Sequence, residues 1–190
     1  VKNRRPRFEV LWLVMIKSLH YNCFSIYSSR IRVETSFLHN VYPVSSIMRD
    51  LVQHIELLLN SFSSLVGREL LVHDGSREER VRFLFDAPFV VVSHGLENDP
   101  ILNYGNKKAL CLWEMTWEEF VRTPSRKTAE LVHRNERARL LDRTRQNGYI
   151  DDYAGIRISK TGKRFKINQA VIWNISDENG RYYGQAATFD

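Results

Sequence analysis

Cysteine is scarce in this sequence, and long apolar runs are missing from it. Two cysteines, Cys23 and Cys111, occur among 190 residues, which is too few for a disulfide framework. No apolar run approaches the roughly 18 residues that a membrane-spanning helix needs. Hydrophobic residues nevertheless make up 43% of the chain and charged residues 26%, as in ordinary globular domains. These proportions predict a folded domain with its own core, without disulfides, in a reducing compartment.

The motifs of catalytic and metal sites are also missing. There is no His-x-x-x-His or Cys-x-x-Cys pair, so we expect no metal site. Residues 105–108 (Gly-Asn-Lys-Lys) lack the spacing of a phosphate-binding loop. Ser93, His94 and Asp99 make a poor triad, because neighbouring residues of a strand point to opposite faces. We predict a protein that is not an enzyme, with an enzyme of unknown reaction as the alternative.

Positive charge is concentrated in the first quarter of the chain. Residues 1–47 hold seven Lys or Arg and two Glu, whereas residues 48–190 hold 21 Lys or Arg and 20 Asp or Glu. The later part is almost neutral, so we expect it not to bind nucleic acid. We expect a poorly ordered basic extension over 1–47 in a cytoplasmic protein. Its Arg- and Ser-rich, acid-poor composition leaves a plastid transit peptide as the alternative.

A regular apolar stripe predicts an amphipathic helix over residues 48–67. Its positions lie three and four residues apart, which is the spacing of one helical face. The stripe consists of Met48, Leu51, Ile55, Leu58, Phe62 and Leu65. Such a stripe can pair with a second copy of itself or lie on the sheet of its own domain. We predict a homodimer with this helix in the interface, followed by a polar connector over 68–85.

The pattern beyond the connector alternates between strands and helices. Strands are predicted at 88–93, 101–104, 153–159, 164–175 and 182–189. Between the second and third strands, Asn106 and Thr116 are capping residues that begin two helices, and a charged helix follows over 129–147. This order predicts an α+β fold, in which a five-stranded antiparallel sheet carries helices on one face.

Several short segments resemble the MEKHLA domain family, which has a PAS-like fold. They are residues 93–94 (Ser-His), 99–106 (Asp-Pro-Ile-Leu-Asn-Tyr-Gly-Asn), 112–115 (Leu-Trp-Glu-Met), 124–126 (Pro-Ser-Arg), 155–159 (Gly-Ile-Arg-Ile-Ser) and 184–189 (Gly-Gln-Ala-Ala-Thr-Phe). The resemblance covers residues 86–189. In plant class III homeodomain–leucine zipper transcription factors this domain is C-terminal and is associated with control of dimerisation. These 190 residues contain no homeodomain, so the resemblance implies a stand-alone sensory or regulatory module for protein interaction or dimerisation.

The PAS-like resemblance also raises the question of a cofactor. Light sensors of this fold that bind flavin covalently use a reactive cysteine, and Ser125 stands where that cysteine would fall. We therefore expect no covalent flavin, and we expect Cys111 to be a small buried apolar residue. Flavin without a covalent bond, and haem held by His133, are the alternatives.

Polar and aromatic side chains of the predicted strands and helices are candidates for a ligand pocket. Gln169 is expected on the same face as Trp173, because alternate residues of the strand 164–175 share a face. A buried amide needs a hydrogen-bond partner, which is either the backbone or a ligand. The candidate ligand-binding residues are Asn103, Trp113, Arg126, His133, Gln169, Trp173 and Gln185. The alternative is that the aromatic side chains fill the core and the amides bond to the backbone.

The extension generates the first testable prediction. A chain that begins at Met48 is expected to melt at the same temperature as the full chain, because residues 1–47 lie outside the predicted fold. The measurement is the melting temperature of each chain under the same conditions. A fall of more than about 5 °C, roughly 1 kcal/mol for a domain of this size, would show that the extension contributes to stability.

Overall fold

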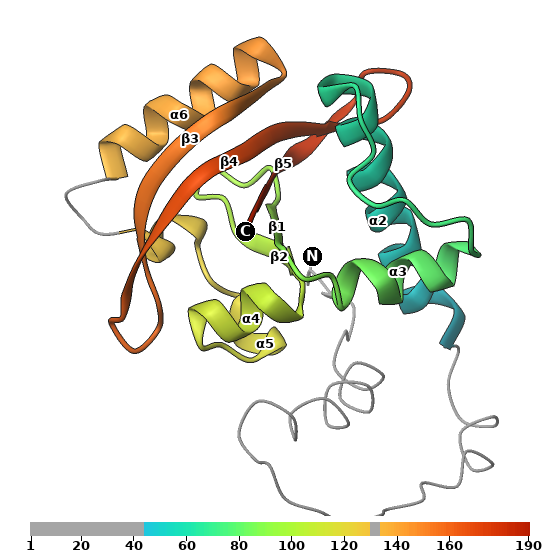
Figure 1. Ribbon diagram of the computed structural model, residues 1–190, viewed down its shortest axis with the longest axis horizontal. Helices are drawn as coiled ribbons and strands as arrows, with labels where there is room; N and C mark the ends of the chain where they lie inside the picture. Colours follow the sequence, from blue (N-terminus) through green and yellow to red (C-terminus); the bar gives the residue numbers. More distant parts are fainter. Residues whose placement is uncertain (1–43, 130–133) are drawn as a thin grey trace, which may run out of the picture. The chain divides into compact units, whose positions relative to one another are not determined.

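The computed structural model describes residues 44–129 and 134–190, so the expectations for residues 1–43 and for His133 lie outside it. Residues Val52–Asp190 form one compact unit. This unit is built on a five-stranded antiparallel sheet of order β2-β1-β5-β4-β3 (Figure 1). The prediction of a PAS-like α+β fold is confirmed. No helix in the described part of the chain is long and apolar enough to cross a membrane.

The strand bounds differ by a few residues from those predicted. They are β1 Val90–His94, β2 Leu102–Gly105, β3 Tyr149–Ile158, β4 Arg164–Ser176 and β5 Tyr182–Phe189. The central strand β5 pairs with β1 and β4, and two adjacent rows of residues cross all three strands. Val92, Ala187 and Ile172 form one row, and Ser93, Ala186 and Trp173 form the next. Successive residues of a strand point to opposite faces, so the side chains of the first row lie on one face of the sheet and those of the second row lie on the other.

Helices α4, α5 and α6 cover the face that carries the Ile172 row. They are α4 Lys107–Trp113, α5 Trp117–Phe120 and α6 Arg134–Asn147, with a 3-10 turn η3 at Ser125–Thr128 between α5 and α6. Trp113 and Phe120 belong to one core cluster with Val90 and Ala170, and Leu140 packs on Ile172. The helix predicted to begin at residue 129 does not begin there, because Ala129 is extended.

Both predicted capping residues are confirmed. Thr116 forms a capping box with Glu119 at the start of α5. Asn106 is fully buried, and its Oδ1 accepts from the backbone N–H groups of Ala109 at 3.1 Å and Val91 at 3.0 Å. Its Nδ2 donates to the carbonyl of Phe89 at 2.7 Å. One side chain thus joins the start of α4 to β1.

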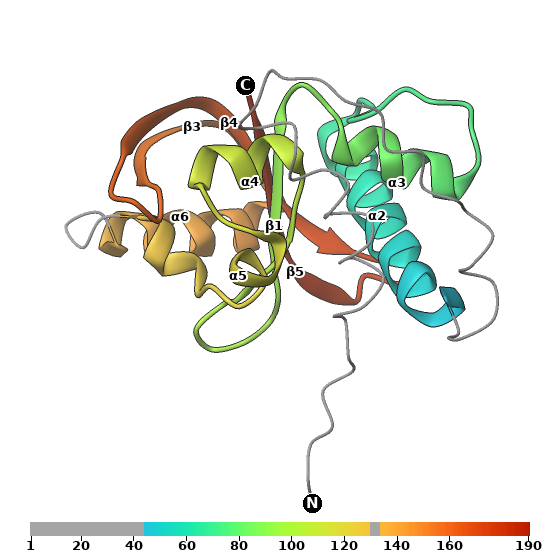
Figure 2. The ribbon, with the colours of Figure 1, turned by 90° about the horizontal axis from the view of Figure 1, so that it is seen from below.

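Helix α2, Val44–Val66, ends before Gly67, whose φ of 76° favours glycine. Figures 1 and 2 show α2 on the other side of the sheet from α6. The ring of Phe62 packs edge-on against Trp173 at 4.9 Å, and Trp173 Nε1 donates to Ser61 Oγ at 3.2 Å. The part of α2 in the domain therefore covers the face that carries the Trp173 row.

This packing corrects the predicted dimer helix. Ile55, Leu58 and Phe62 are fully buried within a single chain, so they cannot also form a seam with a second copy. Leu51 and Leu65 are half-buried. The apolar stripe reflects burial in the core of the helix's own domain, which requires the same spacing as a coiled coil.

The predicted connector over 68–85 contains a helix, α3 Arg77–Phe85. A capping box begins it: Ser76 Oγ accepts from the backbone of Glu79 at 3.2 Å, and Glu79 Oε2 accepts from that of Ser76 at 2.7 Å. Val81, Leu84 and Phe85 are its buried residues. The helix has only nine residues and a weak apolar stripe, so its sequence reads as polar.

His54 of α2 forms a hydrogen bond to the sheet. Its Nε2 is 3.0 Å from Ser93 Oγ, and Ser93 Oγ donates to Asn103 Oδ1 at 2.6 Å. Because the single hydroxyl hydrogen of Ser93 goes to Asn103, the Ser93 oxygen accepts from the Nε2–H of His54. Burial lowers the pKa of His54 to about 4, so this histidine is neutral at pH 7.

The depressed pKa predicts a pH-dependent stability. Between pH 6.5 and 4 the unfolded chain binds a proton at His54 that the folded chain does not. The free energy of unfolding therefore decreases as the pH is lowered through this range. A loss of up to about 2 kcal/mol is expected between pH 7 and 5, measured by chemical denaturation. His54→Gln is expected to remove this part of the slope, whereas the control His73→Gln keeps it. Equal slopes in the wild type and His54→Gln would contradict the assignment.

Candidate functional site

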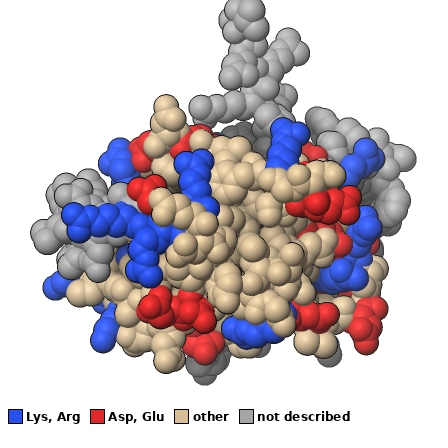
Figure 3. All heavy atoms as spheres, turned by 90° about the horizontal axis from the view of Figure 1, so that it is seen from above, with Lys and Arg blue, Asp and Glu red and all other residues tan. Residues whose placement is uncertain are grey.

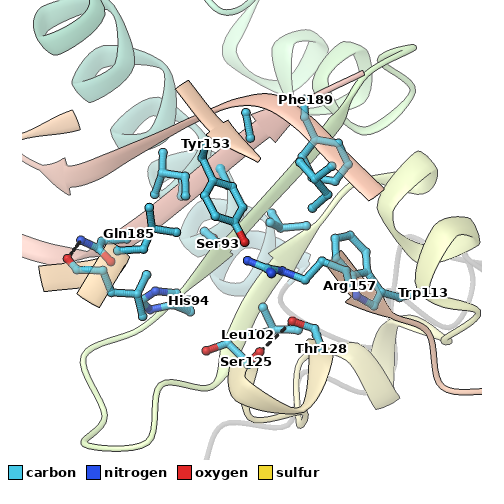
Figure 4. A pocket seen from close by; sticks show the side chains of 18 of the residues that line it. Ser93, His94, Leu102, Trp113, Ser125, Thr128, Tyr153, Arg157, Gln185 and Phe189 are labelled. Carbon is cyan, nitrogen blue, oxygen red and sulfur yellow. Dashed lines mark hydrogen bonds between the residues drawn. The ribbon is translucent and has the colours of Figure 1, made fainter. Parts of the chain in front are cut away.

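A cavity of about 70 Å³ lies between the sheet and the helices on the Ile172 face (Figure 4). Val92, Ala187 and Ile172 from the sheet line one side of it. Trp113, Phe120 and Leu140 from α4, α5 and α6 line the other, together with residues of η3. A volume of this size holds several water molecules or an organic molecule smaller than benzene, which occupies a cavity of roughly 150 Å³.

A bulge in β4 shapes the cavity wall. Tyr153 pairs with Ala170 and Gly155 with Ile167, so β4 has one more residue than β3 between these pairs. Gln169 lies in the bulge at a φ of 52°, in the left-handed region, and its side chain is exposed. The bulge brings Ile167 and Ala170 to the same face, and both line the cavity.

The same bulge corrects the predicted face of β4. Simple alternation put Gln169 beside Trp173, but the extra residue reverses the side on which later residues fall. Ile167, before the bulge, lines the cavity, whereas Trp173, after it, packs on α2. Gln169, exposed in the bulge, and Trp173, buried against α2, therefore both lie outside the cavity.

Two of the cavity's polar side chains have structural partners. Gln185 is buried, and its Nε2 donates to the carbonyl of Leu141 at 2.9 Å and to Asn174 Oδ1 at 3.0 Å. Thr128 Oγ1 donates to the carbonyl of Ser125 at 2.7 Å. Gln185 thus holds β5 against α6, and its amide hydrogens are already engaged.

Arg157 and Trp113 also line the cavity, but they have donor groups that no acceptor among the described residues occupies. Arg157, on β3, is 7% exposed; its guanidinium lies 5.1 Å over the ring of Tyr153, and Nη1 donates to the carbonyl of Ile156 at 3.1 Å. Trp113 Nε1 is buried and has no hydrogen-bond partner among the described residues. Sequence reasoning missed Arg157 as a site residue. The available signal was a charged residue between Ile156 and Ile158 in a strand.

The structure brings only part of the predicted ligand-binding set together. Trp113 and Gln185 line the cavity. Asn103 is exposed on β2, and Arg126 is exposed and pairs with Asp99 at 2.9 Å. With Gln169 and Trp173, these residues lie outside the cavity, and His133 lies outside the described residues.

The triad considered in the sequence does not converge. The Ser93 hydroxyl bonds to Asn103, while His94 Nδ1 lies 3.0 Å from the carbonyl of Gly95. Asp99 pairs with Arg126 at the surface. In the ranges 44–129 and 134–190, no group of three or more His, Cys, Asp or Glu could hold a metal ion.

The cavity residues do not fit a flavin. Pockets for drug-sized ligands and cofactors have roughly 300–1,000 Å³, several times the volume of this one. No cysteine of the described chain lines it, and Cys111 is exposed on α4 instead of buried as expected. Haem is larger than the isoalloxazine ring of flavin and fits no better.

Comparison with known families places this fold. Residues 52–190 match the MEKHLA domain. The chain belongs to the MEKHLA family. The matched range begins within α2, so it includes the later part of α2 and all of α3, together with the region from residue 86 that the sequence pattern indicated. No curated protein matches the chain.

Solved structures similar to this MEKHLA domain are PAS and LOV domains. The PAS domain of a protein from Colwellia psychrerythraea has a TM-score of 0.52 and 16% identity, and the match covers 60% of this chain and 93% of that one. An RNA-binding light-oxygen-voltage receptor has a TM-score of 0.53 and 14% identity, and the match covers 63% of this chain and 34% of the receptor. At these identities the similarity shows a shared fold.

The bulge of the MEKHLA domain generates a prediction about Gln169. Glycine reaches a positive φ without strain, whereas a β-branched residue does not. Gln169→Gly is therefore expected to leave the free energy of unfolding within about 1 kcal/mol of wild type, and Gln169→Val to lower it by roughly 1–3 kcal/mol. Asn168→Val, at the exposed neighbouring position, is the control and is expected to be neutral. Equal stabilities for the two Val variants would contradict a strained bulge.

Proposed function

We propose that the domain is a non-enzymatic regulatory module that binds a small molecule in the cavity between the sheet and helices α4 to α6. The observation that carries the proposal is the lining of the cavity by both layers of the fold. A ligand between the layers contacts both, so it favours the arrangement in which they are closely packed. The LOV-type and haem alternatives are less well supported, because the cavity is too small for either group.

The sheet supplies a route from the cavity to α2. The row of Val92, Ala187 and Ile172 lines the cavity. The adjacent row consists of Ser93, Ala186 and Trp173; Ser93 and Ala186 also border the cavity, and Ser93 and Trp173 contact α2. The side chains of Ser93 and Trp173 bond to His54 and Ser61 of α2. A shift of these strands on ligand binding would therefore move contacts of α2 directly.

The output of the module is proposed to be interaction with a protein, either a partner or a second copy of the chain. Figure 3 shows Lys and Arg interspersed with Asp and Glu on one face of the described molecule, around an uncharged central area. Mixed charge of this kind does not supply the single-sign field that nucleic-acid binding uses. It is compatible with a protein interface, whose central part is usually depleted of charge.

Cavity binding is tested with a matched pair of variants. Ala170→Leu places a larger side chain in the cavity, and Ala154→Leu makes the same change at an exposed position of β3. The full chain is titrated with a library of organic molecules smaller than benzene, of about three to six non-hydrogen atoms, and amide resonances are followed by NMR. Wild type and Ala154→Leu are expected to bind members of the library, with shifts at cavity residues, and Ala170→Leu is expected to bind none.

Thermal melts show whether the variants are folded. Ala170→Leu is expected to melt within a few degrees of wild type, because part of the added side chain occupies existing space. The proposal fails if no member of the library shifts cavity resonances of the wild type. It also fails if a well-folded Ala170→Leu binds as the wild type does.

A further inference from the structure

The cavity contains a buried cation without a protein counter-ion. Arg157 is 7% exposed, and its guanidinium lies in the middle of the cavity beside Tyr153 (Figure 4). None of the ion pairs formed by the described residues includes Arg157. Its one hydrogen bond to the protein goes to the neighbouring carbonyl of Ile156. A guanidinium has five N–H donors, so most of its hydrogen-bonding capacity is unused by the protein.

A buried charge is costly unless a partner compensates it. Buried arginines are therefore normally paired with carboxylates and hydrogen-bonded. The ring of Tyr153 at 5.1 Å supplies a cation–π contact, but it accepts none of the in-plane N–H groups. The position of Arg157 thus suits a partner that arrives in the cavity.

The other cavity residues indicate what this partner is. Among the described residues that line the cavity there is no Asp or Glu, so the lining carries formal positive charge and no negative charge. Trp113 Nε1, another donor in the lining, is buried and has no partner among the described residues. Both groups require an acceptor, and the remaining lining is mainly apolar, including Leu102, Phe120 and Ile167.

We infer that the cavity binds a small organic carboxylate, with its oxygens on Arg157 and its apolar part against the side chains around it. Arginine matches the planar geometry of a carboxylate and bonds to it in a bidentate manner. The apolar lining favours an organic acid over an inorganic anion, which would lose hydration without compensation. The volume of about 70 Å³, roughly half that of a cavity that holds benzene, limits the acid to a few carbon atoms. This inference names the ligand class of the proposed function and rests on it.

The experiment compares acids with neutral molecules of the same shape. Acetate and propionate, each alongside its amide, are titrated into the full chain, and affinity is measured by NMR or calorimetry. In wild type the acids are expected to bind about 10- to 100-fold more tightly than the amides, because charge-assisted hydrogen bonds are stronger than neutral ones. The indole N–H resonance of Trp113 is expected to shift with the acids.

Variants of Arg157 identify the residue responsible. Arg157→Met keeps an extended apolar side chain without the charge and is expected to abolish the preference for acids while amide binding persists. Arg157→Lys keeps the charge but not the bidentate geometry, so an intermediate preference is expected. Arg143→Met removes an exposed arginine from α6 and is the matched control, with wild-type preference. In the absence of ligand, Arg157→Met is expected to raise the melting temperature by about 2–4 °C, because an uncompensated buried charge is lost.

Each outcome distinguishes the inference from the function on which it rests. If wild type binds acids and amides equally well, the cavity binds small molecules but the carboxylate assignment is wrong. If none of these probes binds but other library members shift cavity resonances, the assignment fails and the proposed function stands. If nothing binds, both fail.

A lower melting temperature for Arg157→Met, with the acid preference unchanged, would assign Arg157 a structural role through its stacking on Tyr153. If Arg157→Met does not fold, Arg157→Lys decides, and an unchanged acid preference there overturns the bidentate contact.

Discussion

The sheet needs apolar cover on both of its faces, and the arrangement of the domain depends on this constraint. In the central strand β5, Ala186 and Phe189 are both almost fully buried, and Ala186 pairs with the buried Trp173 and Phe189 with the buried Val90. Helices α4 to α6 cover one face, and α2 covers the other through Phe62 and Trp173. Burying side chains of this size stabilises a domain by roughly 1.5–3 kcal/mol each, so neither layer can be removed without exposing part of the core. This explains why the family match extends back into α2.

The two faces have different chemistry. On the α2 face three polar contacts join side chains: His54 to Ser93, Ser93 to Asn103, and Trp173 to Ser61. The buried Tyr104 hydroxyl, on a ring 6.1 Å from that of His54, has no partner among the described residues. On the cavity face Arg157 and Trp113 retain unused donors. The difference that matters for the proposed site is charge, because the guanidinium of Arg157 lies on the cavity face. The sheet between them is one layer of backbone thick, which gives the cavity a short path to α2.

Local features of the fold could be predicted from the sequence, because local signals determine them. Asn106 and Thr116 were recognisable as caps, and the alternation of strands and helices gave the order of the sheet-forming segments. The partner of α2 could not be predicted, since a stripe of helical period shows that one face is buried but not what buries it. The site was recovered only through Trp113 and Gln185. Simple alternation along β4 placed Trp173 in the pocket, and the bulge at Gln169 makes that placement wrong. The bulge arises from the pairing of β4 with β3, which strand periodicity alone does not reveal.

The position of β5 also determines the order in which the domain can be assembled. This strand is the last of the five in sequence, yet it lies at the centre of the sheet between β1 and β4. The β1–β2 pair and the β3–β4 pair are therefore two separate halves until the ribosome has released β5. Closure of the sheet must therefore follow translation of the whole domain. Because the pairing of β5 with β1 joins distant parts of the chain, this closure is expected to be slow relative to helix formation. A nascent chain arrested before residue 182 would present two unjoined sheet edges to any chaperone nearby.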